Sequence, residues 1–171
     1  MNRRYFIDSF VMFGVAATTV SPAALFTSFA QTKEKTKAKV SLNKVIKSDE
    51  EWKRILTPDQ YFITRQAGTE APYSSPLLNI HDSGTFDCVC CDLPLFSSKT
   101  KFESGTGWPS FWVPIDKRNV QKRSDDTLSE TRTEVLCARC DAHLGHVFDD
   151  GPMPTGLRYC MNGVALKFTR D

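Results

Sequence analysis

Two identical Cys-x-x-Cys pairs constrain this chain more than any other feature: Cys88 with Cys91, and Cys137 with Cys140. Each pair offers two thiolates at the spacing of a zinc knuckle, and two pairs fill a tetrahedral shell. The pairs are separated by 45 residues, whereas a short zinc ribbon leaves about 15–20. One metal ion would therefore join two distant hairpins. The spacing predicts one structural zinc ion per chain, with no open position for water.

Residues 1–30 have the composition of an export signal rather than of a folded domain. Arg3 and Arg4 give a basic start, a mostly apolar stretch follows, and a small-x-small cleavage site ends it. Residues 2–7 resemble a twin-arginine signal, although Asp8 departs from that pattern and leaves a general secretory signal as an alternative. A membrane anchor is another alternative, which the polar residues within the apolar stretch disfavour. We expect an exported protein, periplasmic in a bacterium, after cleavage of this signal.

A charged segment without apolar periodicity follows at residues 31–47. We interpret it as a flexible, solvated linker rather than as a binding patch. The remaining residues, 48–171, have a length that fits one domain. The whole chain has a formal net charge of +2, which is too small to indicate nucleic acid as a partner.

Two helix starts follow one another at the beginning of this domain. Ser48 with Glu51, and Thr57 with Gln60, each fit a capping box, in which side chains and backbone amides bond reciprocally. From Gly68 onward, short alternating apolar segments are broken by turn residues. The strand-like segments include residues 111–115, 120–123, 131–136 and 159–168. The predicted fold class is mainly β, with antiparallel strands and one or two short N-terminal helices.

Six cysteines in an exported protein could instead form three disulfide bonds. A disulfide within a Cys-x-x-Cys pair is strained and typical of redox motifs, so both pairs could also serve a disulfide oxidoreductase. Two matched pairs suit tetrahedral thiolate ligation better. A metal at these four residues would also tie together segments that are far apart in the sequence.

A fifth cysteine, Cys160, stands apart from both pairs. Alternate side chains of a strand share a face, so Arg158, Cys160 and Asn162 would point one way. Tyr159 and Met161 would then point toward a core. A thiol between a guanidinium and an amide lies where the thiolate, the attacking form, is favoured. A buried structural cysteine is the alternative, but it would more usually have apolar neighbours two positions away.

Two histidines and a tryptophan could complete a site around this thiol. Gly145 permits a bulge that would bring His143 and His146 to one side of a sheet. Without the bulge, one would lie at the surface and the other in the core. A histidine near a redox thiol can donate a proton to a leaving oxygen. Trp108, held between a glycine and a proline, would present its indole to an apolar group such as a methyl. A core position is the alternative for Trp108 and the preferred interpretation of Trp112.

From about Ser48 to Thr169 the chain resembles the B-type methionine sulfoxide reductases. Besides both knuckles, the matching segments are residues 100–105, 107–111, 132–135, 140–148 and 154–160. The resemblance implies two antiparallel β-sheets stapled by one structural zinc ion. It also implies roles for six residues: Cys160 as the catalytic thiol, Trp108 as the holder of the substrate methyl group, His143, His146 and Asn162 as groups that bind or protonate the sulfoxide oxygen, and Arg158 as the residue that favours the thiolate.

Enzymes of this kind reduce the R epimer of methionine sulfoxide, so the resemblance implies repair of oxidised proteins or peptides, with the free amino acid as another substrate. It implies that the Cys160 thiolate attacks the sulfoxide sulfur and becomes a sulfenic acid, which must then be reduced. Many members carry a resolving cysteine where this chain has Thr106. Cys90 is the remaining candidate, but exchange requires the two sulfurs to meet. We therefore expect an external thiol or a thioredoxin-like donor.

A zinc-stapled binding module with an aromatic pocket is a competing function, because a fold does not by itself imply chemistry. Such a module has no need of a thiol beside Arg158, His143 and Asn162. The expected partners are thus oxidised proteins or peptides and a reductant, without nucleic acid and without a stable membrane anchor.

Overall fold

The computed structural model describes residues 42–171, so the expected export signal and residues 31–41 of the expected linker lie outside the described residues. None of the described helices is long and apolar enough to cross a membrane. The last residues of the expected linker contact the domain. The Val45 amide donates to the Arg139 carbonyl at 2.8 Å, and Lys44 pairs with Asp141. Packing against the domain therefore includes residues before the expected boundary at Ser48.

Two short helices come first: α1 (Asp49–Ile55) and α2 (Pro58–Gln66). Both capping boxes form as predicted. The side chains of Ser48 and Thr57 each accept from the backbone of the third helical residue, whose side chain bonds back to the cap. Trp52 of α1 is 1% exposed, so this helix is anchored in the core by one large side chain.

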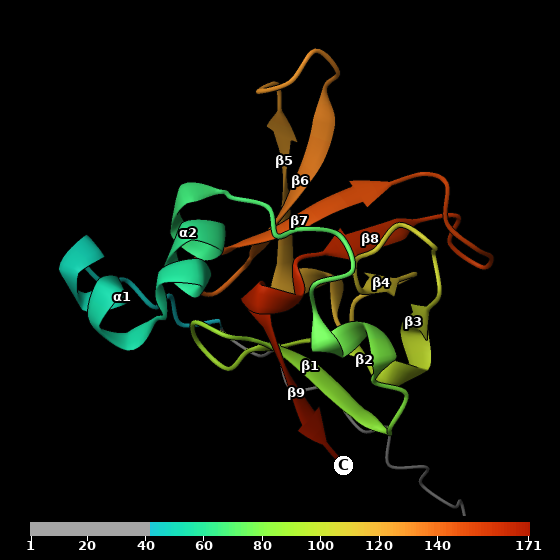
Figure 1. Ribbon diagram of the computed structural model, residues 1–171, viewed down its shortest axis with the longest axis horizontal. Coiled ribbons are helices and arrows are strands. Elements are labelled where there is room, and N and C mark those ends of the chain that lie inside the picture. The colour runs from blue at the N-terminus through green and yellow to red at the C-terminus, as the bar shows by residue number, and fades with distance from the viewer. Residues whose placement is uncertain (1–41) are drawn as a thin grey trace, which may run out of the picture. The chain divides into compact units, whose positions relative to one another are not determined.

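The strands of the described residues form two antiparallel sheets (Figure 1). The smaller has the order β2-β1-β9, from β1 (Gly84–Cys88), β2 (Pro94–Ser97) and β9 (Leu166–Arg170). The larger has the order β3-β4-β8-β7-β6-β5, from β3 (Lys101–Phe102), β4 (Ser110–Phe111), β5 (Val120–Asp125), β6 (Arg132–Cys137), β7 (His143–Phe148) and β8 (Arg158–Met161). Short 3₁₀ helices interrupt the connections: η1 (Pro76–Asn79), η2 (Ser98–Thr100), η3 (Lys117–Asn119) and η4 (Gly163–Ala165). The predicted fold class is confirmed.

Aromatic side chains join the two sheets. Phe111 of β4 stacks on Phe96 of β2 with ring centroids 4.5 Å apart, and it meets Phe86 of β1 edge-on at 4.9 Å. All three rings are fully buried, and the burial of each contributes about 1.5–3 kcal/mol. Tyr159 of β8 also contacts Phe96, so one face of β8 belongs to this core. Trp112, for which we expected a core position, is only half-buried.

Candidate active site and metal centre

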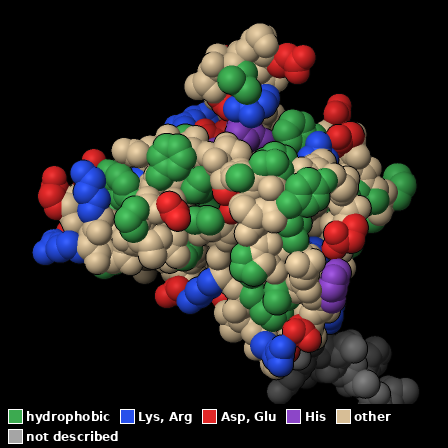
Figure 2. All heavy atoms as spheres, in the orientation of Figure 1, with side chains coloured by type: hydrophobic (Ala, Val, Ile, Leu, Met, Phe, Trp, Pro, Cys, Tyr) green, Lys and Arg blue, Asp and Glu red, His purple; other side chains and the backbone are tan. Residues whose placement is uncertain are grey.

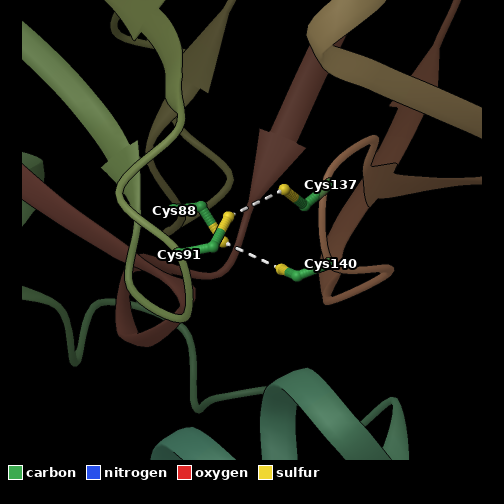
Figure 3. Close-up of side chains that lie close together, drawn as sticks. All are labelled: Cys88, Cys91, Cys137 and Cys140. Carbon is green, nitrogen blue, oxygen red and sulfur yellow. Dashed lines mark hydrogen bonds between the residues drawn. The ribbon is translucent and has the colours of Figure 1, made fainter. Parts of the chain in front are cut away.

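Four cysteine sulfurs from the two knuckles converge at the ends of β1 and β6 (Figure 3). The Sγ atoms of Cys88 and Cys140 are 3.7 Å apart, and those of Cys91 and Cys137 are 3.5 Å apart. All four sulfurs lie within 4.8 Å of one another. A tetrahedral zinc ion with Zn–S bonds of about 2.3 Å separates its sulfurs by about 3.8 Å. The cluster therefore fits zinc, and it would link the smaller sheet to the larger one.

Both knuckles end in the same kind of turn, although one follows a strand of the smaller sheet and the other a strand of the larger sheet. The residue after each pair, Asp92 or Asp141, has a left-handed backbone with a φ of 58° or 56°, a conformation that aspartate tolerates better than most residues. The amide of each of these aspartates donates at 2.9 Å to the carbonyl of the first cysteine of its pair. This repeated turn directs both sulfurs of a pair to one side.

All six cysteines lie within the described residues, and none of them forms a disulfide bond. Cys90 is buried at the metal cluster, where its side chain lies beside Cys88, Cys140 and Thr64. Cys160 interacts with a different set of groups, which includes Thr106 and Arg158. The two remaining thiols therefore occupy different surroundings.

Cys160 lies on β8, where the side chains alternate as predicted. Tyr159 and Met161 are buried in the core, whereas Cys160 is half-buried on the opposite face. There it lines a cavity of about 110 Å³. The other lining residues come from five separate segments and are Thr69, Trp108, Arg132, Gly145, His146, Phe148 and Asn162. The structure thus brings three of the predicted site residues, Trp108, His146 and Asn162, around this thiol.

Two effects act on the pKa of Cys160 in opposite directions. Burial raises the pKa of the thiol and is the larger effect. The Thr106 hydroxyl, 3.8 Å from the sulfur, and the positive charge of Arg158 lower the pKa. Arg158 does not line the cavity. Its guanidinium makes two hydrogen bonds of 2.8 Å to Asp150 and lies 4.4 Å from the centre of the Phe148 ring. It therefore acts on the thiol in the predicted direction, but less strongly than burial does.

A bulge in β7 brings the two histidines to the same face. Glu134 of β6 pairs with His146 and Val135 pairs with Gly145, but Leu136 then pairs with His143, so one residue of β7 is extra. The two imidazole centroids are consequently 5.5 Å apart. Gly145 is required here because it has a φ of +150° and because a Cβ would lie 2.2 Å from the Cys160 carbonyl oxygen.

Each histidine bonds to a carboxylate on another strand of the larger sheet, His143 to one on the adjacent β6 and His146 to one on β5, the strand beyond β6. His146 Nε2 lies 2.7 Å from Asp125 Oδ2, and Arg132 also binds this carboxylate. His143 Nδ1 lies 2.7 Å from Glu134 Oε1, whereas His143 Nε2 is buried without a hydrogen-bond partner. Burial lowers the pKa of His143, and the hydrogen bond to Glu134 partly offsets this. The two carboxylates thus fix which ring nitrogen of each histidine remains for other partners.

The two histidines differ in which cavities they line. His146 lines both the Cys160 cavity and a second cavity of about 380 Å³, whereas His143 lines only the second one. Imidazole atoms are visible in Figure 2 at the base of the β5–β6 hairpin, between basic and apolar side chains. His143 is therefore placed to act on the thiol site through His146 or through solvent rather than by direct contact.

Glu70, which no local sequence pattern marks, binds residues on two sides of the Cys160 cavity. Its carbonyl accepts from the Trp108 indole at 3.2 Å, and its amide donates to the Asn162 side chain at 3.1 Å. Its buried carboxylate accepts from the amides of Gly163 and Val164 at 2.6 and 2.9 Å. This one residue of the loop after α2 therefore positions Trp108, Asn162 and the backbone that follows β8.

We expect Glu70→Gln to lower the free energy of unfolding by about 1–3 kcal/mol, because one buried backbone amide loses its acceptor. The Michaelis constant for a substrate bound in the Cys160 cavity should rise as well, because the carboxylate anchors the loop whose backbone carbonyl and amide bind Trp108 and Asn162. Urea unfolding and steady-state kinetics measure these effects. Glu50→Gln, at an exposed position of α1, is the matched control and should change stability by less than about 0.5 kcal/mol. Equal stabilities of the two variants would contradict the anchoring role.

Comparison with known proteins agrees with this geometry. Residues 56–170 match the SelR domain. The peptide methionine sulfoxide reductase MsrB of Hahella chejuensis is 52% identical over 127 residues, which cover 74% of this chain and 91% of that protein. MsrB of Leptospira interrogans is 54% identical over 127 residues, 74% of this chain and 97% of that protein. The chloroplastic peptide methionine sulfoxide reductase B1 of Arabidopsis thaliana is 56% identical over 129 residues, 72% of this chain and 64% of that protein. The chain therefore belongs to the SelR-domain family of B-type peptide methionine sulfoxide reductases.

Proposed function

We propose that this protein reduces the R epimer of methionine sulfoxide in proteins and peptides, with Cys160 as the nucleophile. The observation that carries the proposal is the cavity in which Cys160 faces an indole wall from Trp108 and polar groups from His146 and Asn162. The indole suits the methyl group of the substrate, and the polar groups suit the sulfoxide oxygen. A sulfoxide sulfur bound between them lies within reach of the thiolate.

In the proposed reaction the Cys160 thiolate attacks the sulfoxide sulfur while a proton is delivered to the oxygen. The net step breaks the S–O bond of the substrate and forms an S–O bond on Cys160. The substrate sulfur gains two electrons and leaves as a thioether, and the cysteine sulfur loses two and becomes a sulfenic acid. His146 is the proposed proton donor, because it lines the Cys160 cavity and because Asp125 holds one of its ring nitrogens.

The sulfenic acid must be reduced before the next turnover. Thr106 lies against Cys160 at the position where many members of the family have a cysteine, and Cys90 lies at the metal cluster. We therefore propose that an external dithiol, of the thioredoxin kind, or two small thiols reduce the sulfenic acid directly. The donor becomes a disulfide, and the oxygen leaves as water.

We assign to the four-cysteine cluster a structural zinc ion, because four thiolates leave no position for a substrate. From the pattern of residues 1–30 we propose that the protein is exported and, in a bacterium, acts in the periplasm. Its substrates there would be oxidised proteins that present methionine sulfoxide at their surface.

An epimer-resolved assay of the full chain tests the proposed reaction. With dithiothreitol as the reductant, we expect complete consumption of the R epimer of a methionine sulfoxide peptide and no consumption of the S epimer. Chromatographic separation of the two epimers provides the measurement. Reduction of both epimers at equal rates, or of neither, would rule out the proposed specificity.

A further inference from the structure

A chain of three hydroxyl groups ends at the Cys160 sulfur. Ser110 is the direct cross-strand neighbour of Cys160, and its Oγ lies 2.7 Å from that of Ser104. The Ser104 hydroxyl lies 2.8 Å from Thr106 Oγ1, which in turn lies 3.8 Å from Cys160 Sγ. At its other end the chain reaches the Trp108 carbonyl, to which Ser110 donates at 3.1 Å.

The carbonyl at one end fixes the direction of these hydrogen bonds while Cys160 is a neutral thiol. A carbonyl oxygen can only accept, and each hydroxyl has one proton to donate. Ser110 therefore donates to Trp108, Ser104 to Ser110, and Thr106 to Ser104, which leaves the Thr106 oxygen to accept from the thiol. Every group in this arrangement has a partner.

Loss of the thiol proton allows the whole chain to reverse without movement of any heavier atom. The thiolate can only accept, so Thr106 turns its proton to the sulfur, Ser104 donates to Thr106, and Ser110 donates to Ser104. The Thr106 amide, 3.4 Å from Ser104 Oγ, donates to that oxygen in either direction and holds Ser104 in place during the reversal. The site thus presents a hydrogen-bond donor to the sulfur in its attacking form.

We propose, on the basis of the function proposed above, that Thr106 is a catalytic residue whose hydroxyl donates a hydrogen bond to the Cys160 thiolate. Ser104 is a positioning residue, because it acts on the sulfur through Thr106, whereas Ser110 belongs to the hydroxyl chain and also interacts with the sulfur directly. Thr106 therefore stands where many relatives have a resolving cysteine. Its hydroxyl would favour ionisation of Cys160, whereas a resolving cysteine would form a disulfide bond with it.

Other charged groups also face the thiol and must be held constant in a test. Arg158 of β8, paired with Asp150, lowers the pKa of Cys160. His146 of β7 and Arg132 of β6 line the same cavity, and both bind Asp125. A test therefore has to change a hydroxyl while it leaves all of these side chains in place.

Thr106→Val removes the hydroxyl and keeps the shape of the side chain, whereas Thr106→Ser keeps the hydroxyl. The pH dependence of iodoacetamide alkylation of Cys160, read by mass spectrometry of its peptide in the zinc-loaded full chain, reports the thiolate fraction. We expect the midpoint for Thr106→Val to rise by about one pH unit, and the alkylation rate below the midpoint to fall about tenfold. Thr106→Ser should have the same midpoint as the unchanged protein. Thr85→Val, which makes the same substitution on β1 of the other sheet, is the control and should also leave the midpoint unchanged.

Ser104→Ala provides a second variant, because it removes the support for Thr106 without touching the sulfur. Its midpoint should shift in the same direction as that of Thr106→Val, but less. An unchanged midpoint in Thr106→Val, or equal shifts in Thr106→Val and Thr106→Ser, would overturn the proposal. Alkylation requires no substrate, so this result is independent of whether the protein reduces methionine sulfoxide, which the epimer assay decides.

Discussion

Cys160→Ser is expected to lose reduction of methionine sulfoxide completely, with kcat/KM lower by about 10³-fold or more. A cysteine sulfur can accept the sulfoxide oxygen as a sulfenic acid, and a thiol can then reduce it back to the cysteine. A serine oxygen can do neither. The side chain is half-buried and its two neighbours on β8 remain in the core, so the substitution should leave the fold intact. Consumption of the R epimer with dithiothreitol provides the measurement.

Cys90→Ser is the matched control, because it also removes one thiol but at the metal cluster. With dithiothreitol as the donor, this variant should retain activity as long as its zinc content equals that of the unchanged protein. Retained activity in Cys160→Ser would eliminate the assignment of the nucleophile. Loss of activity in a zinc-loaded Cys90→Ser would show instead that Cys90 takes part in turnover.

Local sequence patterns predicted the features that depend on neighbours a few residues away. The capping boxes at Ser48 and Thr57 formed as expected, because each needs only a residue three positions later. The alternation around Cys160 was equally visible, because a strand repeats every two residues. The knuckle spacing similarly predicted that two cysteine pairs would meet.

The remainder of the site depends on contacts between distant residues. Glu70 binds Asn162 across 92 positions of the sequence, and no local periodicity marks it. Asp125 likewise reaches His146 across 21 positions. That His146 reaches the Cys160 cavity while His143 does not depends on the register of β6 against β7, which a glycine in β7 permits but does not specify. Local patterns therefore indicate the candidate reacting groups but not the groups that orient them.

Removal of zinc is expected to unfold the protein, because the four sulfurs connect the end of β1 in one sheet with the end of β6 in the other. Structural zinc contributes about 10–16 kcal/mol in small domains at neutral pH, which equals or exceeds the usual stability of about 5–15 kcal/mol. The aromatic core around Phe111 packs residues from both sheets. We therefore expect the chelated protein to lose this packing as well as the metal.

Circular dichroism and metal analysis during titration with a chelator test this expectation. One zinc ion per chain should be released together with the near-ultraviolet signal of the packed aromatic residues. Cys137→Ser, which removes a ligand, should reproduce the apo state, whereas Cys90→Ser, which removes a buried neighbour of the same cluster, should remain folded and zinc-loaded. A native, metal-free protein would contradict the structural role. Because Cys160 belongs to a separate cavity, its substitution should leave the zinc content unchanged, so that stability and reactivity are lost by different substitutions.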